Sequence, residues 1–186
     1  MPPRSSKVLG RANARPAKIK HLPPRDIYVK ACVEAHINPN SGILDLLSPY
    51  ANCPSVESIN VRSNYLGDKG AIPLFAVVER CPNLVELNLS ENGLRNHAIV
   101  SLCDTVMKHP SLRRVDVSDN YISEGAAVRL HALLEDNPRI CWLGIDNTKI
   151  DVQWRVKLRD LVRANAEAMA IKEAEAAAET ALREGC

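Results

Sequence analysis

One pattern of leucines and asparagine returns every 28 residues along the middle of this chain. The clearest copy, residues 84–94, reads Leu-x-x-Leu-x-Leu-x-x-Asn-x-Leu, and similar copies begin at Val56, Leu112 and Ile140. A unit this short cannot bury both inner faces of its own strand and helix, so neighbouring units have to stack on one another. The period therefore restricts the chain to a repeat solenoid with one continuous core.

Each unit carries a strand pattern followed by a helix pattern. Behind the strand segment a small or apolar residue returns every fourth position, as in Ala98, Leu102 and Val106, which places one apolar stripe on a helix. A proline two residues before each unit, such as Pro82, ends the preceding helix. These features predict the α/β class: a short solenoid with parallel strands on its concave face and helices on its convex face. An asparagine ladder is predicted to satisfy backbone groups where each strand turns into its loop, formed by Asn64, Asn92 and Asn120.

The two ends of the repeat region depart from this pattern. Gly42, Leu46 and Tyr50 stand one period before the first full helix, so we expect an incomplete first unit with its strand near residues 27–33. At the other end Trp154 takes the position of a small residue. A tryptophan cannot pack there as glycine or alanine does, so the last helix is expected to tilt outward and close the open end of the core.

The C-terminal segment lacks the signal that ends the earlier helices. Ala166 stands where the other units have proline, and the residues after it are mostly alanine and glutamate, which favour helix. We therefore predict that the last helix runs on, with a frayed and solvated tail as the alternative. The predicted organisation is an N-terminal arm (1–26), a repeat domain (27–165) and a helical extension (166–186).

Basic residues gather in the N-terminal arm. Residues 1–30 hold eight Lys and Arg against the single acid Asp26, whereas the rest of the chain holds sixteen bases and twenty-one acids. Such an arm favours contact with an acidic surface, either tubulin or RNA, over the alternative of a solubilising tail. Its prolines disfavour the amphipathic helix that mitochondrial import needs, so a mitochondrial location is less expected. The arm residues assigned to this contact are Arg4, Lys7, Arg11, Arg15, Lys18, Lys20 and Arg25.

Cysteine usage and hydropathy bear on the compartment. The chain has six cysteines, with neither a C-x-x-C pair nor a secretory signal, which indicates unpaired thiols in a reducing compartment. It has no apolar run long enough to span a membrane. We therefore expect a cytoplasmic protein without membrane contact.

No motif for catalysis or metal binding is found, and the nearest candidate is a coincidence of register. Cys81 and His109 occupy the same position in neighbouring units, about 5 Å apart at the spacing of strands. An adjacent imidazole can activate a thiol, but a position just before proline favours a helix-capping role. Cys103 and His131 share another register position, to which the same argument applies. We predict no catalytic residue, no metal, no cofactor and no small-molecule substrate.

The concave face offers the best candidates for partner binding. Side chains alternate along a strand, so the positions between the inward leucines point to this face. They are polar and mixed in sign, without the row of bases that binds phosphates. Trp142, beside Arg114, is expected to be exposed, unless the C-terminal segment folds back over it, and both residue types are enriched in binding hot spots. The predicted partner-binding residues are Arg62, Glu86, Asn88, Arg114, Asp116 and Trp142.

These repeats resemble the ribonuclease-inhibitor-like class of leucine-rich repeats over about residues 27–165, and the repeat count and long last helix are similar to the tropomodulin C-terminal domain. The resemblance implies a non-catalytic scaffold for protein partners. We expect a structural subunit of a stable intracellular assembly and, by analogy, favour microtubule or axonemal complexes of a cilium or flagellum. The alternatives are a ribonucleoprotein subunit with its arm on RNA, tropomodulin-like binding of actin filaments, and a regulator of an enzyme.

Overall fold

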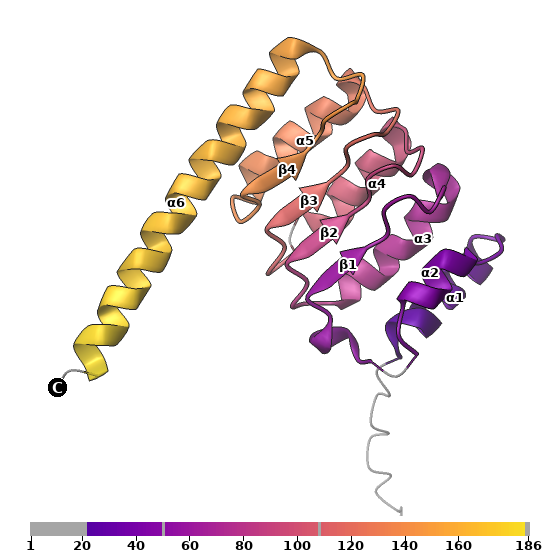
Figure 1. Ribbon diagram of the computed structural model, residues 1–186, viewed down its shortest axis with the longest axis horizontal. Helices are drawn as coiled ribbons and strands as arrows, with labels where there is room; N and C mark the ends of the chain where they lie inside the picture. Colours follow the sequence, from indigo (N-terminus) through magenta and orange to yellow (C-terminus); the bar gives the residue numbers. More distant parts are fainter. Residues whose placement is uncertain (1–21, 50, 108, 185–186) are drawn as a thin grey trace, which may run out of the picture.

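A computed structural model describes residues 22–49, 51–107 and 109–184. Four short parallel strands form one sheet in the order of the sequence, and three helices pack behind them on the convex side (Figure 1). This arrangement confirms the predicted solenoid. The strands are β1 (Ser58–Asn60), β2 (Glu86–Asn88), β3 (Arg114–Asp116) and β4 (Trp142–Gly144), and the helices between them are α3 (Gly67–Arg80), α4 (Asn96–Val106) and α5 (Glu124–Asp136).

The strands pair one repeat period apart, which aligns the inward leucine positions of neighbouring units. Leu87 of β2 lies beside Val115 of β3, and both side chains are fully buried. From the helices, Leu74, Leu102 and Leu130 meet them as one stripe and are equally buried. The core is therefore a single layer between sheet and helices, as the period predicts.

The first unit differs from the prediction. The strand expected near residues 27–33 is wrong, because this segment forms helix α1 (Pro24–Glu34). Proline in the first turn favours a helix start, and Ile27, Tyr28 and Cys32 are buried in α1, which packs against α3. The sheet therefore begins at β1, and α1 covers the end of the helix layer instead of adding a strand.

A short helix and a 3₁₀ turn connect α1 to β1. In α2 (Ser41–Leu46) the buried residue is Ile43, whereas Leu46 is 54% exposed, so the inward stripe expected through Leu46 is also wrong. Tyr50, assigned to the same stripe, lies outside the described residues. The 3₁₀ turn η1 (Cys53–Ser55) then leads into the sheet.

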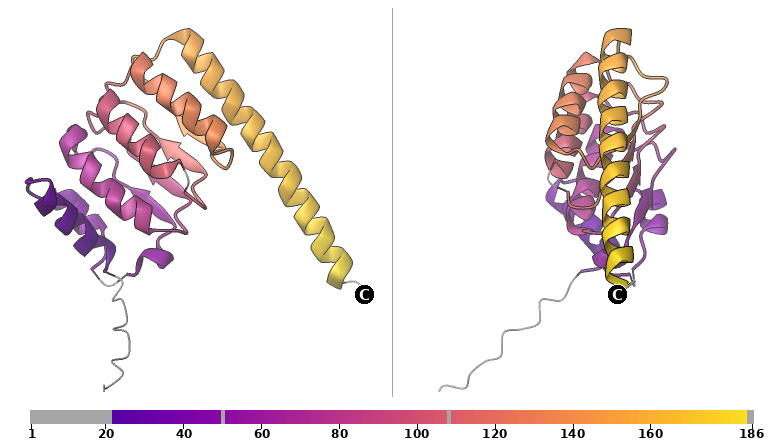
Figure 2. Two further views of the ribbon diagram at one scale, coloured as in Figure 1. Left: turned by 180° about the vertical axis from the view of Figure 1, so that it is seen from behind. Right: turned by 90° about the vertical axis from the view of Figure 1, so that its left-hand side faces the viewer.

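The last helix, α6 (Val152–Glu184), runs without a break through the position of the missing proline. Its first turns close the helix side of the core: Leu158 is fully buried, and the Trp154 ring meets His131 edge-on, with centroids 5.6 Å apart. Further along, α6 diverges from the body (Figure 1), and seen from its end the solenoid has α6 projecting between helices and strands (Figure 2). The outward tilt predicted from Trp154 is thus present. Across the described residues no helix combines the length and hydropathy needed to cross a membrane.

Candidate partner-binding surface

The asparagine ladder fixes the loops that follow the strands. The Asn92 side chain makes five hydrogen bonds to backbone groups: its Oδ1 accepts from two N–H groups of the preceding unit, and its Nδ2 donates to three carbonyls. Asn120 repeats the arrangement one unit later, and Asn64 donates in the same way at the start. In the last unit Thr148 Oγ1 donates to Ile145 O at 2.8 Å. The loops at the rim of the concave face are therefore held in fixed positions.

Three of the predicted binding residues form a row across the concave face. Glu86, Arg114 and Trp142 are register partners on β2, β3 and β4. Arg114 Nε lies 4.0 Å from Glu86 Oε1, and its guanidinium carbon lies 4.6 Å from the centre of the Trp142 ring, a cation–π distance. Trp142 remains 37% exposed, so the C-terminal segment does not fold over it. The row ends in a solvent-accessible indole backed by a cation.

Two other predicted residues are engaged inside the protein. Asn88 Oδ1 accepts from Ser90 N at 3.0 Å, and Asp116 Oδ1 accepts from Ser118 N at the same distance. Gly144 makes room for the second of these contacts, since a Cβ at this position would lie 2.3 Å from Asp116 Oδ1. Asn88 and Asp116 therefore shape the strand ends and offer a partner only their remaining half-exposed surface.

Arg62 lies at the rim of the face and pairs with a residue that sequence reasoning did not select. Its guanidinium donates to the Glu91 carboxylate, which also accepts from the Ser63 hydroxyl. Hydrogen bonds from Arg62 and then Ser63 hold the pKa of Glu91 below its usual range. Arg62 and Glu91 thus neutralise each other at the β1 end of the concave face.

Exposed tyrosines on the loop ridge were also missed. Tyr65 is 91% exposed and Tyr121 is 64% exposed, and the Lys149 Nζ atom lies 5.9 Å from the centre of the Tyr121 ring. Together with Gly93, they occupy one repeat position in the loops. Comparing this position between the units of the sequence would have identified the two tyrosines. A hollow of about 470 Å³ lies between the two rings.

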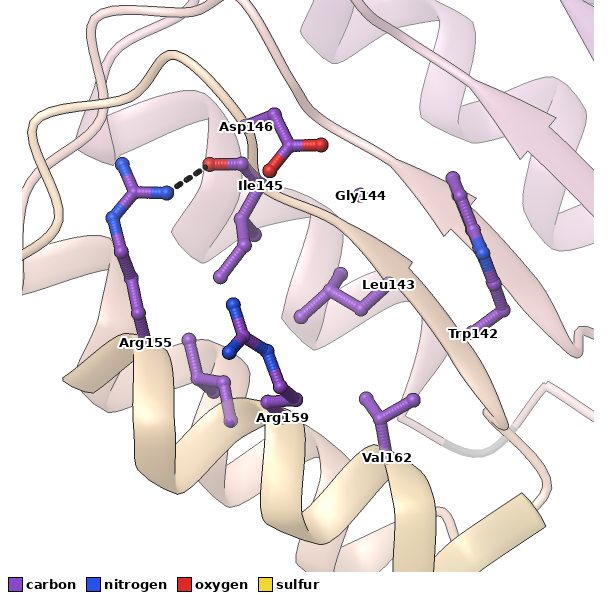
Figure 3. A pocket seen from close by; sticks show the side chains of 9 residues that line it. Trp142, Leu143, Gly144, Ile145, Asp146, Arg155, Arg159 and Val162 are labelled. Carbon is purple, nitrogen blue, oxygen red and sulfur yellow. Dashed lines mark hydrogen bonds between the residues drawn. The ribbon is translucent and has the colours of Figure 1, made fainter. Parts of the chain in front are cut away.

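A pocket of about 190 Å³ lies between β4 and α6 (Figure 3). Leu143 and Ile145 line it from the strand side, and Arg155, Arg159 and Val162 line it from the helix. Comparison of equivalent repeat positions does not indicate this pocket, because it exists only where α6 diverges from the last strand. Of its lining, Trp142 alone is among the predicted partner-binding residues.

Cys81 and His109 meet through the backbone and not through the thiol. His109 Nδ1 accepts from Ser111 N and Leu112 N, which leaves the proton on Nε2 to be donated to Cys81 O at 3.1 Å. Burial lowers the pKa of His109, and burial together with neighbouring Cys53 raises that of Cys81 to about 12. The ring is neutral and the thiol protonated, so this geometry serves loop capping.

The second cysteine–histidine pair, Cys103 and His131, likewise shows no contact between thiol and imidazole. His131 Nδ1 lies 3.2 Å from Glu135 Oε2, so its nearest charged neighbour is this carboxylate and not Cys103. The five cysteines of the described residues are free thiols. Within the same ranges, no cluster of His, Cys, Asp and Glu is arranged to hold a metal ion.

The basic arm falls largely outside the described residues. Of the seven residues assigned to it, Arg25 lies within them, in the first turn of α1. The other six lie in residues 1–21, so their contact with an acidic surface stays a prediction.

Comparison with known proteins identifies the type of repeat. Residues 52–75 and 80–103 match the leucine-rich-repeat family model. A solved structure described as leiomodin-1 actin-binding site 2 aligns with a TM-score of 0.52 at 11% identity, over 68% of this chain and 90% of that chain. A tropomodulin C-terminal domain from Caenorhabditis elegans aligns with a TM-score of 0.48 at 11% identity, over 66% of this chain and 91% of that chain. No sequence among the curated proteins matches. The chain thus carries leucine-rich repeats, and its fold is similar to that of the leiomodin-1 domain.

Proposed function

We propose that this chain is a non-catalytic interaction domain that binds a protein partner across its concave face, as a structural subunit of a cytoskeletal assembly. The observation that carries the proposal is the exposed pair of Arg114 and Trp142. Tryptophan and arginine are enriched in binding hot spots, and here the cation–π contact between the two side chains fixes their positions before a partner binds. A partner that covers this pair gains contact area without having to order it.

The charge pattern favours a protein partner over nucleic acid at this face. Acidic Glu86 alternates with basic Arg114, and the Arg62 guanidinium is already paired with a carboxylate. Phosphate recognition instead requires several unpaired bases along one line. RNA binding is accordingly a proposal for the N-terminal arm alone.

Among cytoskeletal partners we propose to test actin filaments first. The similar solved structure is described as an actin-binding site of leiomodin-1, and the shared fold at 11% identity supports the comparison without carrying the partner over. The microtubule or axonemal partner favoured by analogy, like the ribonuclease-inhibitor-like class of the repeat, remains a separate proposal.

Cosedimentation of the full chain with actin filaments, with microtubules and with RNA tests these partners side by side. Arg114→Ala and Trp142→Ala should each weaken protein binding about tenfold or more, as expected at a hot spot. Val128→Ala, exposed on the outer side of α5, is the control and should leave binding unchanged. Equal binding by all variants would exclude the concave face. A steep loss of binding with rising salt would identify phosphate contacts.

A further inference from the structure

The edge of the sheet at β4 lacks the partner strand that every earlier strand has. In each preceding unit one inward residue directly after the strand donates its N–H to a carbonyl of the next strand, and Ile145 occupies that position after β4. No strand follows β4 among the described residues. The three paired examples are Val61 to Asn88 at 2.9 Å, Leu89 to Asp116 at 2.8 Å and Val117 to Gly144 at 2.9 Å.

At the start of β4, a carbonyl likewise lacks the N–H donors that its counterparts in earlier units have. Val85 O accepts from the two N–H groups at the start of β3, and Arg113 O accepts from Cys141 N and Trp142 N. Cys141 is the next residue in this series, and its carbonyl faces the edge where no strand arrives. One period beyond β4 the chain is already within α6, because no proline ended the helix. Within the described part of the chain, no backbone group pairs with this donor and acceptor at the edge, the arrangement to which an extended chain adds.

The pocket beside this edge has a defined chemistry. Leu143 and Val162 provide apolar walls, and Arg159 reaches from α6 toward the strand between Ile145 and Leu143 (Figure 3). The Arg155 guanidinium is held by backbone carbonyls, at 3.0 Å from Ile145 O and 2.7 Å from Thr148 O.

The balance of charge in the pocket is positive. Asp146 is the single acid of the lining against the two arginines. Neither arginine has a carboxylate within ion-pair distance among the described residues.

A second hollow continues the same course. It measures about 530 Å³ and lies further along α6, between Met169 and Lys172 on the helix and Pro138 and Arg139 on the body. Arg139 and Lys172 add two more bases along the path. Arg113 of the same lining is already paired with Glu173 of α6, so Arg139 and Lys172 are the bases that this hollow adds beyond the β4 edge.

We propose that the β4 edge binds an extended acidic peptide segment of a protein partner, which adds as a fifth strand in the groove between β4 and α6. The inference rests on the proposed function, in that the partner is a protein, and it names a second contact beyond the concave face. Backbone pairing with Ile145 and Cys141 would give the affinity, and a carboxylate against Arg159 would select the acidic segment.

Charge decides against two other occupants of the groove. The N-terminal arm carries six bases and no acid over residues 1–21, so the arginines of the groove repel it. A second copy pairing edge to edge would bring two Arg159 side chains and two α6 helices together. An acidic segment from another protein avoids both conflicts.

Fluorescence anisotropy of the full chain with a soluble labelled peptide, in which valine alternates with glutamate, tests the proposal. Arg159→Glu should weaken binding about tenfold or more, because a charge-assisted contact becomes a repulsion. Arg163→Glu is the matched control: it makes the same charge change one turn later, outside the pocket, at a side chain that pairs with Asp160. This variant should bind within about twofold of the native chain. Equal loss in both variants, or no binding by the native chain, would overturn the proposal.

Two N-methylated peptides test strand addition itself. Alternate amides of a strand point to opposite sides, so methylating one alternate set should abolish binding while methylating the other set leaves it intact. Equal effects of the two sets would contradict strand pairing. Sedimentation must also find the free chain monomeric, since a dimer that the peptide dissociates would assign the edge to a second copy.

The concave face gives an independent readout. Glu86→Ala, on β2 and outside the pocket lining, should leave peptide binding unchanged although it weakens partner binding. Loss of cosedimentation with concave-face variants but not with Arg159→Glu would show that the partner does not use the β4 edge. That result would overturn this inference and preserve the proposed function.

Discussion

The Asn92 side chain, like that of Asn120, contacts five backbone groups, and Asn92→Ala should be severely destabilising. The substitution removes five hydrogen-bond contacts at a residue that is 1% exposed. It leaves the N–H groups of Asn64 and Leu66 without this acceptor, whereas the three carbonyls each keep a second donor. Because Nδ2 has two hydrogens, these contacts amount to at most four hydrogen bonds, and at about 0.5–1.5 kcal/mol net for each the expected loss is about 2–6 kcal/mol. That is a large part of the 5–15 kcal/mol or so that stabilises a typical domain.

Urea denaturation followed by circular dichroism measures this loss, with Asn88→Ala as the matched control. Asn88 is the same residue type in the same unit, is half-buried, and accepts from Ser90 N and Ser90 Oγ only. Its loss should cost about 1 kcal/mol. If the two variants unfold with equal free energies, the asparagine ladder does not hold the loops in place.

Three further predictions follow from burial. Leu87→Ala, in the middle of the sheet, should lower the unfolding free energy by about 2–5 kcal/mol, and an unmoved urea midpoint would contradict the repeat register. Deleting residues 166–186 should change stability by about 1 kcal/mol or less and should not red-shift the emission of Trp142, which the deleted residues do not cover. Burial lowers the pKa of His109, so the unfolded chain takes up its proton first and stability should fall as pH drops below about 6.5. In His109→Asn this fall should be smaller, as measured by urea midpoints across that pH range; an equal fall would assign the pH dependence to other groups.

The repeat made most of the fold predictable, because one period fixes strand, helix and their burial together. The prediction failed at residues 27–33, where the register was extended backward into a segment without the leucine and asparagine positions. There the local signals decided the structure: a proline at the helix start and apolar residues on one helical face. A period predicts a unit only where its own anchor residues are present.

The candidate surface was predictable in direction but not in detail. Strand alternation placed Arg114 and Trp142 together on the concave face, since both follow from register alone. It could not reveal that Asn88 and Asp116 accept backbone N–H groups, which depends on the conformation of each loop. Nor could it reveal the groove beside β4, whose width is set by how Trp154 packs α6 against α5.

The long α6 helix also gives this small domain a lever. Leu158 is fully buried, and Asn165 Nδ2 donates to Leu134 O and Ile140 O. These contacts anchor the first turns of α6, up to Asn165, on the body. Beyond that anchor, residues 166–184 extend about 28 Å at 1.5 Å per residue, with an exposed ion pair between Arg113 and Glu173 as a further contact with the body. A rotation of about 10° at the anchor displaces the far end by about 5 Å, by the same helix geometry. Binding of a peptide that widens the groove at β4 would therefore move the far end of α6 by a larger distance. A second protein bound at that end would experience the change.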